Sequence, residues 1–118
     1  NEAMVQAAGH GRLDIIELMI QRGANNYQEA ANESCMTGKS DVLRWMIENM
    51  HNNNILIDYG IMLKIAAFQS NFDIIDIILS YMFMYNPDIT TNDIYPILVN
   101  NSLSPLQAVS ISRKWINN

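Results

Sequence analysis

The chain has 118 residues, the usual length of one domain, and 49% of them are hydrophobic while 16% are charged. This composition excludes an intrinsically disordered segment, because such segments lack the apolar residues that build a core. Twelve acidic residues against seven basic ones give a formal net charge of −5 at pH 7, which argues against binding to nucleic acid through a basic surface. The single cysteine, Cys35, cannot form a disulfide within the chain, so nothing points to an oxidising compartment.

The start of the sequence has none of the features of a secretory signal peptide, which combines a basic segment, an apolar segment and a cleavage site of small residues. The longest apolar stretch, residues 74–85, is interrupted by Asp76 and Ser80 and is shorter than the roughly 20 residues that span a membrane. We therefore expect an intracellular, cytoplasmic protein that does not associate with a membrane.

Residues 2–25 are predicted to form two short helices joined by a tight turn. The first helix is rich in small residues such as Ala7 and Ala8, which allow neighbouring helices to approach closely. Gly11 falls at the turn, where glycine adopts a positive φ at no steric cost. Asp14 then falls at the start of the second helix, where a carboxylate interacts favourably with unpaired N–H groups. Gly23 is predicted to end that helix as a left-handed cap.

The same pattern recurs in residues 29–51 and 61–85. Each unit has a small residue in its first helix, a turn residue four positions later and an aspartate three positions after the turn. In the three units these residues are Ala7, Gly11 and Asp14; Ser34, Gly38 and Asp41; and Ala66, Ser70 and Asp73. An aliphatic pair follows each aspartate, and Ile16, Leu43 and Ile75, which share one repeat position, are predicted to face the core.

Residues 11–25, with the sequence GRLDIIELMIQRGAN, resemble the second helix and exit turn of an ankyrin repeat almost position for position. The resemblance covers residues 2–79 and is strongest in the first unit. The Thr-Pro-Leu-His opening of ankyrin repeats is absent, and the first period is shorter than the usual 33 or so residues, so the hairpin between units is expected to be reduced or missing. Short units of this kind, linked as at residues 26–30, resemble those of ankyrin-like multigene-family and giant-virus proteins of large DNA viruses.

The resemblance implies an all-α solenoid of antiparallel helix pairs, with three ankyrin-like repeats in residues 1–85 (about 2–25, 29–51 and 61–85). Residues 86–118 are expected to form a degenerate helical cap, in the manner of a fourth pair. Residues 90–93 offer N-caps for a short helix, and Ser104 followed by Pro105 marks the start of another. Leu106 and Val109, together with Trp115, are predicted to face inward from that last helix.

Ser34, Cys35 and His10 are the only candidates for a nucleophile or a base. Ser34 and Cys35 occupy positions where ankyrin-type units place packing alanines, so we expect both to be buried packing residues. His10 lies beside a turn glycine and is expected to be solvated. A zinc site made from His10, Cys35 and His51 would require three separate turns to converge. We therefore expect no enzymatic activity, no metal and no cofactor.

The resemblance implies a non-catalytic protein–protein interaction module: a viral ankyrin-like protein that binds host proteins in the host cytoplasm. Its partner is expected to be a protein rather than nucleic acid or a membrane. The alternative interpretation is a structural or assembly subunit of a larger particle or oligomer, built from the same stacked helices.

In ankyrin-type stacks the first helices of the pairs, with the turns before them, line the inner face. Carried onto this sequence, that face predicts the following partner-binding residues: Glu2, Gln6, Tyr27, Gln28, Asn32, Glu33, Tyr59 and Lys64. Tyr27 and Tyr59 precede a unit at the same repeat position and are the expected anchors, because tyrosine is enriched among interface hot spots. The competing interpretation is that these tyrosines brace the links between units.

Overall fold

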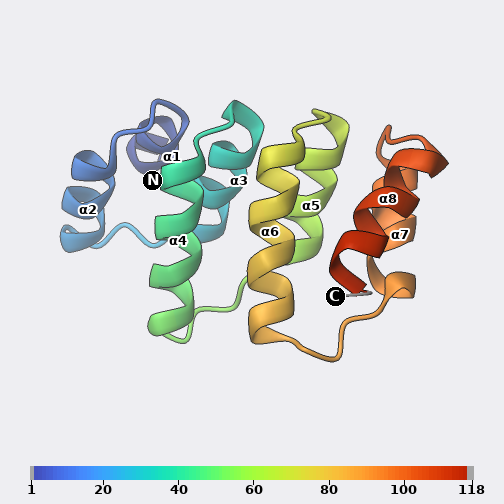
Figure 1. The fold of residues 1–118 in the computed structure, drawn as a ribbon. Helices are drawn as coiled ribbons and strands as arrows, with labels where there is room; N and C mark the ends of the chain where they lie inside the picture. The colour runs from blue at the N-terminus through green and yellow to red at the C-terminus, as the bar shows by residue number, and fades with distance from the viewer. Residues whose placement is uncertain (1, 117–118) are drawn as a thin grey trace. The chain divides into compact units, whose positions relative to one another are not determined.

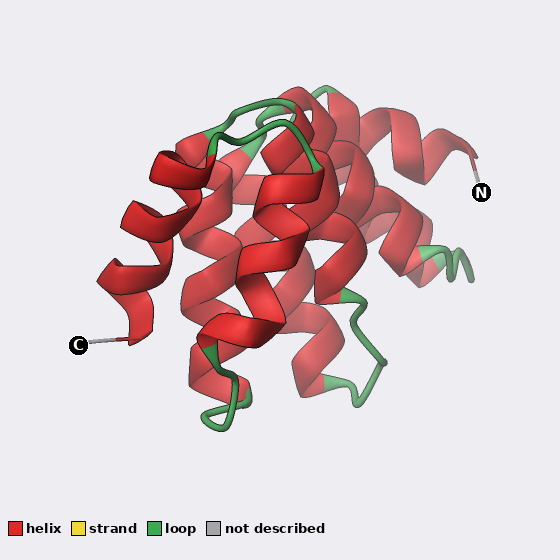
Figure 2. Ribbon diagram, turned by 90° about the vertical axis from the view of Figure 1, so that its right-hand side faces the viewer, coloured by secondary structure: helices red, strands yellow, loops and turns green. Residues whose placement is uncertain are grey.

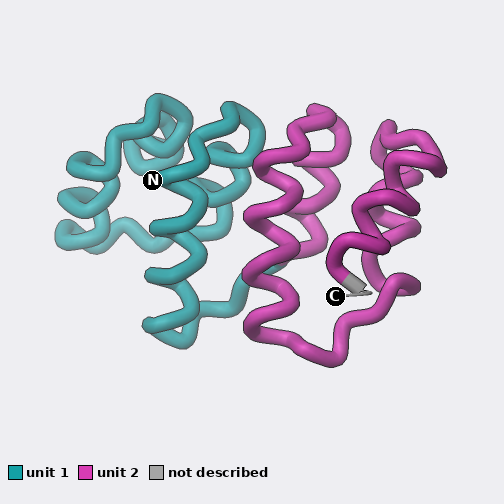
Figure 3. Tube along the Cα trace, viewed as in Figure 1, with its two compact units in different colours: residues 1–58 teal, residues 59–118 magenta. Residues whose placement is uncertain are grey.

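The computed structural model describes residues 2–116, which form eight α-helices and no strand (Figures 1 and 2). The prediction of an all-α fold is therefore confirmed. The chain divides into two compact units, residues 1–58 and residues 59–118 (Figure 3).

The first unit contains two helix pairs. Its helices are α1 (Glu2–Gly9), α2 (Leu13–Gln21), α3 (Tyr27–Thr37) and α4 (Ser40–Asn52). Helix α1 packs against α2, and α3 packs against α4. The first helices of the two pairs, α1 and α3, also pack against each other.

The second unit repeats this arrangement. Its helices are α5 (Tyr59–Phe68), α6 (Phe72–Tyr85), α7 (Thr91–Asn100) and α8 (Pro105–Ile116). Helix α5 packs against α6, α7 packs against α8, and the two first helices, α5 and α7, pack against each other.

One turn geometry joins the helices of every pair. The turn residue has a positive φ in each case: Gly11 at 74°, Gly38 at 72°, Ser70 at 51° and Ser102 at 89°. The residue after it donates its amide N–H to a carbonyl five residues earlier: Arg12 to Ala7 (2.9 Å), Lys39 to Ser34 (2.9 Å), Asn71 to Ala66 (3.0 Å) and Leu103 to Leu98 (3.3 Å). This bond satisfies a carbonyl that the end of the helix leaves without a partner. The small residues predicted at one repeat position, Ala7, Ser34 and Ala66, therefore provide the carbonyl that accepts this hydrogen bond. In the fourth pair Leu98 provides it.

The left-handed cap predicted after the second helix is confirmed. Gly23 has a φ of 96°, and the N–H of Ala24 donates to the carbonyl of Met19 at 2.9 Å. This is the same hydrogen bond that closes the turns within the pairs.

The repeated aspartates lie in the first turn of the second helix of their pairs, as predicted. None of them is the N-cap residue, because that position belongs to Arg12, Lys39 and Asn71. Among these three, only Asn71 accepts a hydrogen bond with its side chain, from the N–H of Ile74 at 3.1 Å. The aspartates therefore contribute their negative charge near the positive end of the helix dipole.

The predicted core column is confirmed: Ile16, Leu43 and Ile75 are fully buried. In the second pair the whole predicted face is buried, since Met46 and Ile47 are also fully inaccessible to solvent. The apolar side chains that follow each turn therefore form the interior of both units, as expected for amphipathic helices.

The starts of α7 and α8 are confirmed, but one part of the predicted inner face of α8 is wrong. Leu106 is 80% exposed, whereas Ala108 and Ser112 are buried. Residues 108 and 112 are four apart and share one helix face, which does not include residue 106. Val109 is half-buried, as is Trp115.

Both α7 and α8 begin with a reciprocal cap. The Thr90 N–H donates to Oδ2 of Asp93 at 2.8 Å, and the Thr90 side chain caps the backbone of the first turn in return. At α8 the Ser104 N–H donates to Oε1 of Gln107 at 3.0 Å, and the Gln107 N–H donates to Oγ of Ser104 at 3.2 Å. These caps satisfy N–H groups that have no partner within the helix.

Candidate functional site

Six of the predicted partner-binding residues lie on the first helices of the first unit. Glu2 and Gln6 are exposed on α1. The four on α3 are each half-buried: Tyr27, Gln28, Asn32 and Glu33. The structure therefore places the α1 residues on open surface, whereas those on α3 are partly covered.

Gln28 connects α3 to the segment that follows α4. Its Oε1 accepts a hydrogen bond from the N–H of Asp58 at 2.8 Å, and its Nε2 lies 3.4 Å from the carbonyl oxygen of Asp58. The same Nε2 donates to Oδ1 of Asn32 at 2.8 Å. Gln28 and Asn32 thus hold the link after α4 against the start of α3, so both side chains contribute to the fold of this unit.

Glu33 belongs to the contact between α1 and α3. A Cβ atom at Gly9 would lie only 3.1 Å from Cγ of Glu33 and 3.7 Å from Cγ2 of Thr37. The absence of a side chain at Gly9 therefore allows the two helices to approach closely. Oε2 of Glu33 is buried and has no hydrogen-bond partner.

The remaining two predicted residues, Tyr59 and Lys64, lie on α5 in the second unit. Lys64 is exposed, whereas Tyr59 is half-buried and its hydroxyl oxygen is buried with no hydrogen-bond partner. Burial raises the pKa of Tyr59 to about 12, with smaller contributions from Tyr85 and Tyr81, whose rings stack with centroids 5.9 Å apart. The buried hydroxyl favours a structural role for Tyr59 over direct contact with a partner protein.

The raised pKa of Tyr59 predicts a difference in alkaline stability between the protein and its Tyr59→Phe variant. Tyrosine ordinarily ionises near pH 10, so the unfolded chain loses this proton first and folding is weakened as the pH rises from about 10 to about 12. The variant lacks this ionisation, and its free energy of unfolding should fall less over that range in urea denaturation. At neutral pH it should be at least as stable, because it removes a buried hydroxyl without a partner. The same alkaline loss in both proteins would contradict the burial of this hydroxyl.

Sequence reasoning missed a set of exposed apolar side chains at the turns. Met36 at the end of α3 is 52% exposed, and Phe68 at the end of α5 is 69% exposed. Met36 and Phe68 each lie two residues after the residue whose carbonyl closes the turn, Ser34 or Ala66. The repeat alignment therefore places both apolar residues at one repeat position, and this could have indicated them.

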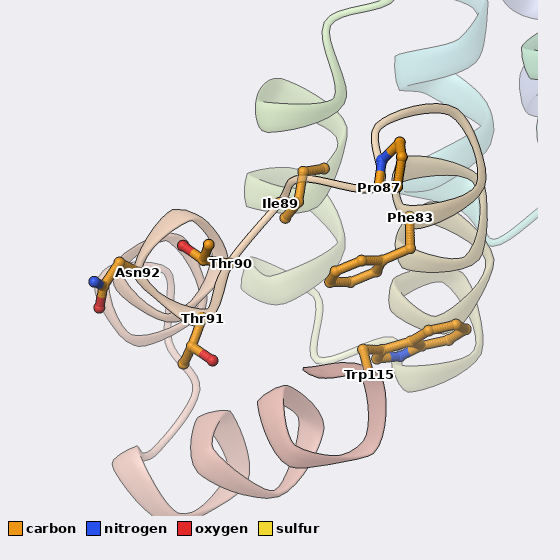
Figure 4. Close-up of a pocket in the computed structure, with 7 residues that line it drawn as sticks. All are labelled: Phe83, Pro87, Ile89, Thr90, Thr91, Asn92 and Trp115. Atoms are coloured by element: carbon orange, nitrogen blue, oxygen red, sulfur yellow. The ribbon is translucent and has the colours of Figure 1, made fainter. Parts of the chain in front are cut away.

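A cleft of about 390 Å³ lies in the second unit between the end of α6, the start of α7 and the end of α8 (Figure 4). The rings of Phe83 and Trp115 form one wall and are nearly parallel, with centroids 5.9 Å apart and an interplanar angle of 4°. Lys114 lies 5.6 Å from the Trp115 ring centroid and forms an ion pair with Asp76 at 2.9 Å, which ties α8 to α6. The full lining is Phe83, Pro87, Ile89, Thr90, Thr91, Asn92 and Trp115. Because none of these side chains is charged, the cleft suits an uncharged group.

The candidates for chemistry are placed as predicted. Ser34 and Cys35 are buried, and Oγ of Ser34 donates to the carbonyl of Ala31 at 2.6 Å. His10 is exposed, with Nδ1 2.8 Å from the carbonyl oxygen of Gln6. Within residues 2–116, no three His, Cys, Asp or Glu side chains are grouped so that they could hold a metal ion.

Burial raises the pKa of the Cys35 thiol to about 12, which predicts an unreactive cysteine. The thiolate is the nucleophilic form, and it is scarce far below the pKa. An aromatic disulfide reagent, dithiobis(nitrobenzoate), at pH 8 should therefore leave the folded protein unmodified and should react with one thiol after denaturation in urea. Rapid modification of the folded protein would show that Cys35 is accessible.

No protein-family model, curated protein sequence or solved structure matches this chain. Among the helices described, none has both the length and the apolar character needed to cross a membrane.

Proposed function

We propose that the chain is an ankyrin-like solenoid of helix pairs that acts as a non-catalytic protein–protein interaction module. One observation carries the proposal: a single turn with a single hydrogen bond recurs in four helix pairs, at Gly11, Gly38, Ser70 and Ser102. Within each unit the first helices of the two pairs pack against each other, which is the arrangement expected of stacked repeats. Repeats of this kind build extended surfaces that bind other proteins.

The first helices of each unit expose side chains that support a binding role. In the first unit these are Glu2 and Gln6 on α1 and the apolar Met36 at the end of α3, and in the second unit they are Lys64 and the apolar Phe68 on α5. Protein interfaces combine polar with apolar side chains. The first repeats resemble the short repeats in proteins of large DNA viruses. On this resemblance we propose that the partners are host proteins in the cytoplasm.

Capture of proteins from a host-cell extract, with identification by mass spectrometry, tests this function. Tyr27→Ala should abolish capture of a specific partner and leave the melting temperature unchanged if the first helices form the binding face. Glu17→Ala on α2 is the control and should capture normally, because Glu17 is exposed on a second helix and lies outside the predicted face. Loss of capture on changing the exposed Arg44 of α4, with Tyr27→Ala still active, would contradict the choice of face.

Size-exclusion chromatography with light scattering separates the binding module from the alternative, an assembly subunit. A stable monomer is the result expected of an interaction module. A protein that exists only as a larger assembly would contradict it and would support the structural role.

A further inference from the structure

We propose that the cleft between the end of α6, the start of α7 and the end of α8 binds a small, uncharged, planar ring compound that carries a hydrogen-bond acceptor. The proposal goes beyond the proposed function, because it concerns a small molecule rather than a protein partner. The volume of the cleft, about 390 Å³, lies near the lower end of the range for small-molecule sites and suits a ligand of about one or two rings.

Aromatic rings supply the flat surface on which a planar ligand packs. Phe83 extends from α6 toward the start of α7, where Thr91 lies on the opposite side of the cleft (Figure 4). The rings of Phe83 and Trp115 are nearly parallel, with centroids 5.9 Å apart. A further planar ring adds to such a pair in an offset arrangement, which is a geometry that aromatic groups prefer. Pro87 and Ile89 supply the rest of the apolar lining.

The side of the cleft formed by the start of α7 is polar. Thr90, Thr91 and Asn92 line it. The hydroxyl of Thr90 lies 3.2 Å from Oδ2 of Asp93, so it belongs to the cap of its own helix. Thr91 is half-buried and offers a hydroxyl to the cleft. A ligand that fits both sides therefore has a flat apolar face and a polar edge.

The aromatic wall contains a hydrogen-bond donor that favours an acceptor on the ligand. Nε1 of Trp115 is buried, and within the described residues it has no hydrogen-bond partner. A buried indole N–H usually has a partner, because an unsatisfied donor costs free energy. A carbonyl oxygen or ring nitrogen of the ligand supplies this partner after a small shift of the lining side chains, of the kind that commonly accompanies binding.

The charges around the cleft favour a neutral ligand over an ion. Lys114 already holds the position of a cation beside the Trp115 ring, 5.6 Å from its centroid, and it pairs with Asp76 at 2.9 Å. A second cation there would be repelled. Asp88 and Asp93 adjoin lining residues in the sequence and disfavour an anion. Because no lining side chain is charged, a buried ion would also have no partner in the cleft.

An NMR titration with benzamide tests the proposal, since benzamide is a neutral planar ring with a carbonyl acceptor. The indole N–H signals of the two tryptophans, Trp45 and Trp115, are the reporters, and Trp45→Phe assigns them. Benzamide should move the Trp115 proton to lower field in a saturable manner, with the millimolar dissociation constant expected of so small a ligand. The Trp45 signal should not move, because Trp45 lies on α4 outside the cleft.

Matched variants and matched probes show which features of the cleft bind. Phe83→Ala should weaken benzamide binding by about fivefold or more, because it removes one ring of the aromatic wall. Phe68→Ala, which changes an exposed phenylalanine on α5 outside the cleft, is the control and should bind normally. Benzoate and benzylammonium share the ring of benzamide but carry a charge, and each should bind about fivefold or more weakly. These two probes test the cleft in the unsubstituted chain.

Three results would overturn the proposal. They are a Trp115 signal that benzamide does not move to lower field in a saturable manner, an ion that binds as tightly as benzamide, and equal binding of benzamide by the protein and a folded Phe83→Ala variant. The proposed function fails separately, because the capture experiment depends on Tyr27 in the first unit and not on this cleft.

Discussion

Replacing Ile16, Leu43 or Ile75 by alanine is expected to lower the free energy of unfolding by about 2–5 kcal/mol in each case. The three side chains share one repeat position, in α2, α4 and α6, and all three are fully buried. Truncation removes the apolar area that folding takes out of water and leaves a cavity that the surrounding helices fill only in part. Urea denaturation of the full chain measures the loss.

Two control substitutions at exposed positions of α2 show whether the loss of stability comes from burial at the shared repeat position. Leu18→Ala replaces an apolar residue on α2 that is 40% exposed and should therefore cost less than Leu43→Ala on α4. Glu17→Ala changes an exposed residue next to Ile16 and should stay within about 0.5 kcal/mol. Equal losses at buried and exposed positions would show that the repeat alignment is wrong.

Removing the glycine of one turn and introducing a glycine at the equivalent position of another should change the free energy of unfolding in opposite directions. Gly11→Ala should lower the free energy of unfolding by about 1 kcal/mol, because the turn has a φ of 74°, which an L side chain adopts at a cost. A Cβ there would meet only Cδ and Cε of Lys39, at 3.6 and 4.0 Å, so the loss reflects the backbone rather than a clash. Ser70→Gly should raise stability by up to about 1 kcal/mol, since Ser70 already has a φ of 51°.

Ser110→Gly, on the exposed side of α8, is the matched control for the serine exchange. It should lower stability, because glycine in a regular helix costs backbone entropy without relieving strain. Thermal and urea denaturation measure all three variants. A loss of stability in Ser70→Gly that matches the loss in Ser110→Gly would contradict the shared turn.

The helix pairs were predictable because local chemistry specifies them. A turn residue at Gly11 or Gly38, an aspartate three residues later and an aliphatic pair after it define where one helix ends, where the next begins and which face is buried. The structure adds that a backbone hydrogen bond closes each of these turns. The fourth pair forms the same bond to the carbonyl of Leu98 and has the same positive φ at Ser102, although Leu98 is not a small residue. The last pair was therefore harder to align, because Leu98 replaces the small residue and Pro105 replaces the aspartate of the other pairs.

Contacts between distant residues were not predictable in the same way. Gln28 bonds to Asp58, thirty residues away, and no local pattern indicates which polar side chain holds a link. The stacking of Phe83 on Trp115 likewise depends on how α8 returns to α6. Leu106 was assigned to the interior by its apolar character, although the buried face of α8 lies at Ala108 and Ser112. Hydrophobicity alone does not determine the rotation of a short helix.

The most direct test of a fourfold repeat is the backbone conformation of the turns in solution, measured by NMR chemical shifts and amide–α-proton couplings on the full chain. The expected result is eight helical segments interrupted by positive φ at Gly11, Gly38, Ser70 and Ser102. The test is sharpest at the two serines, because no glycine is present there to allow this conformation at low cost. Negative φ at Ser70 and Ser102, or a helix that continues through either residue, would contradict the repeat.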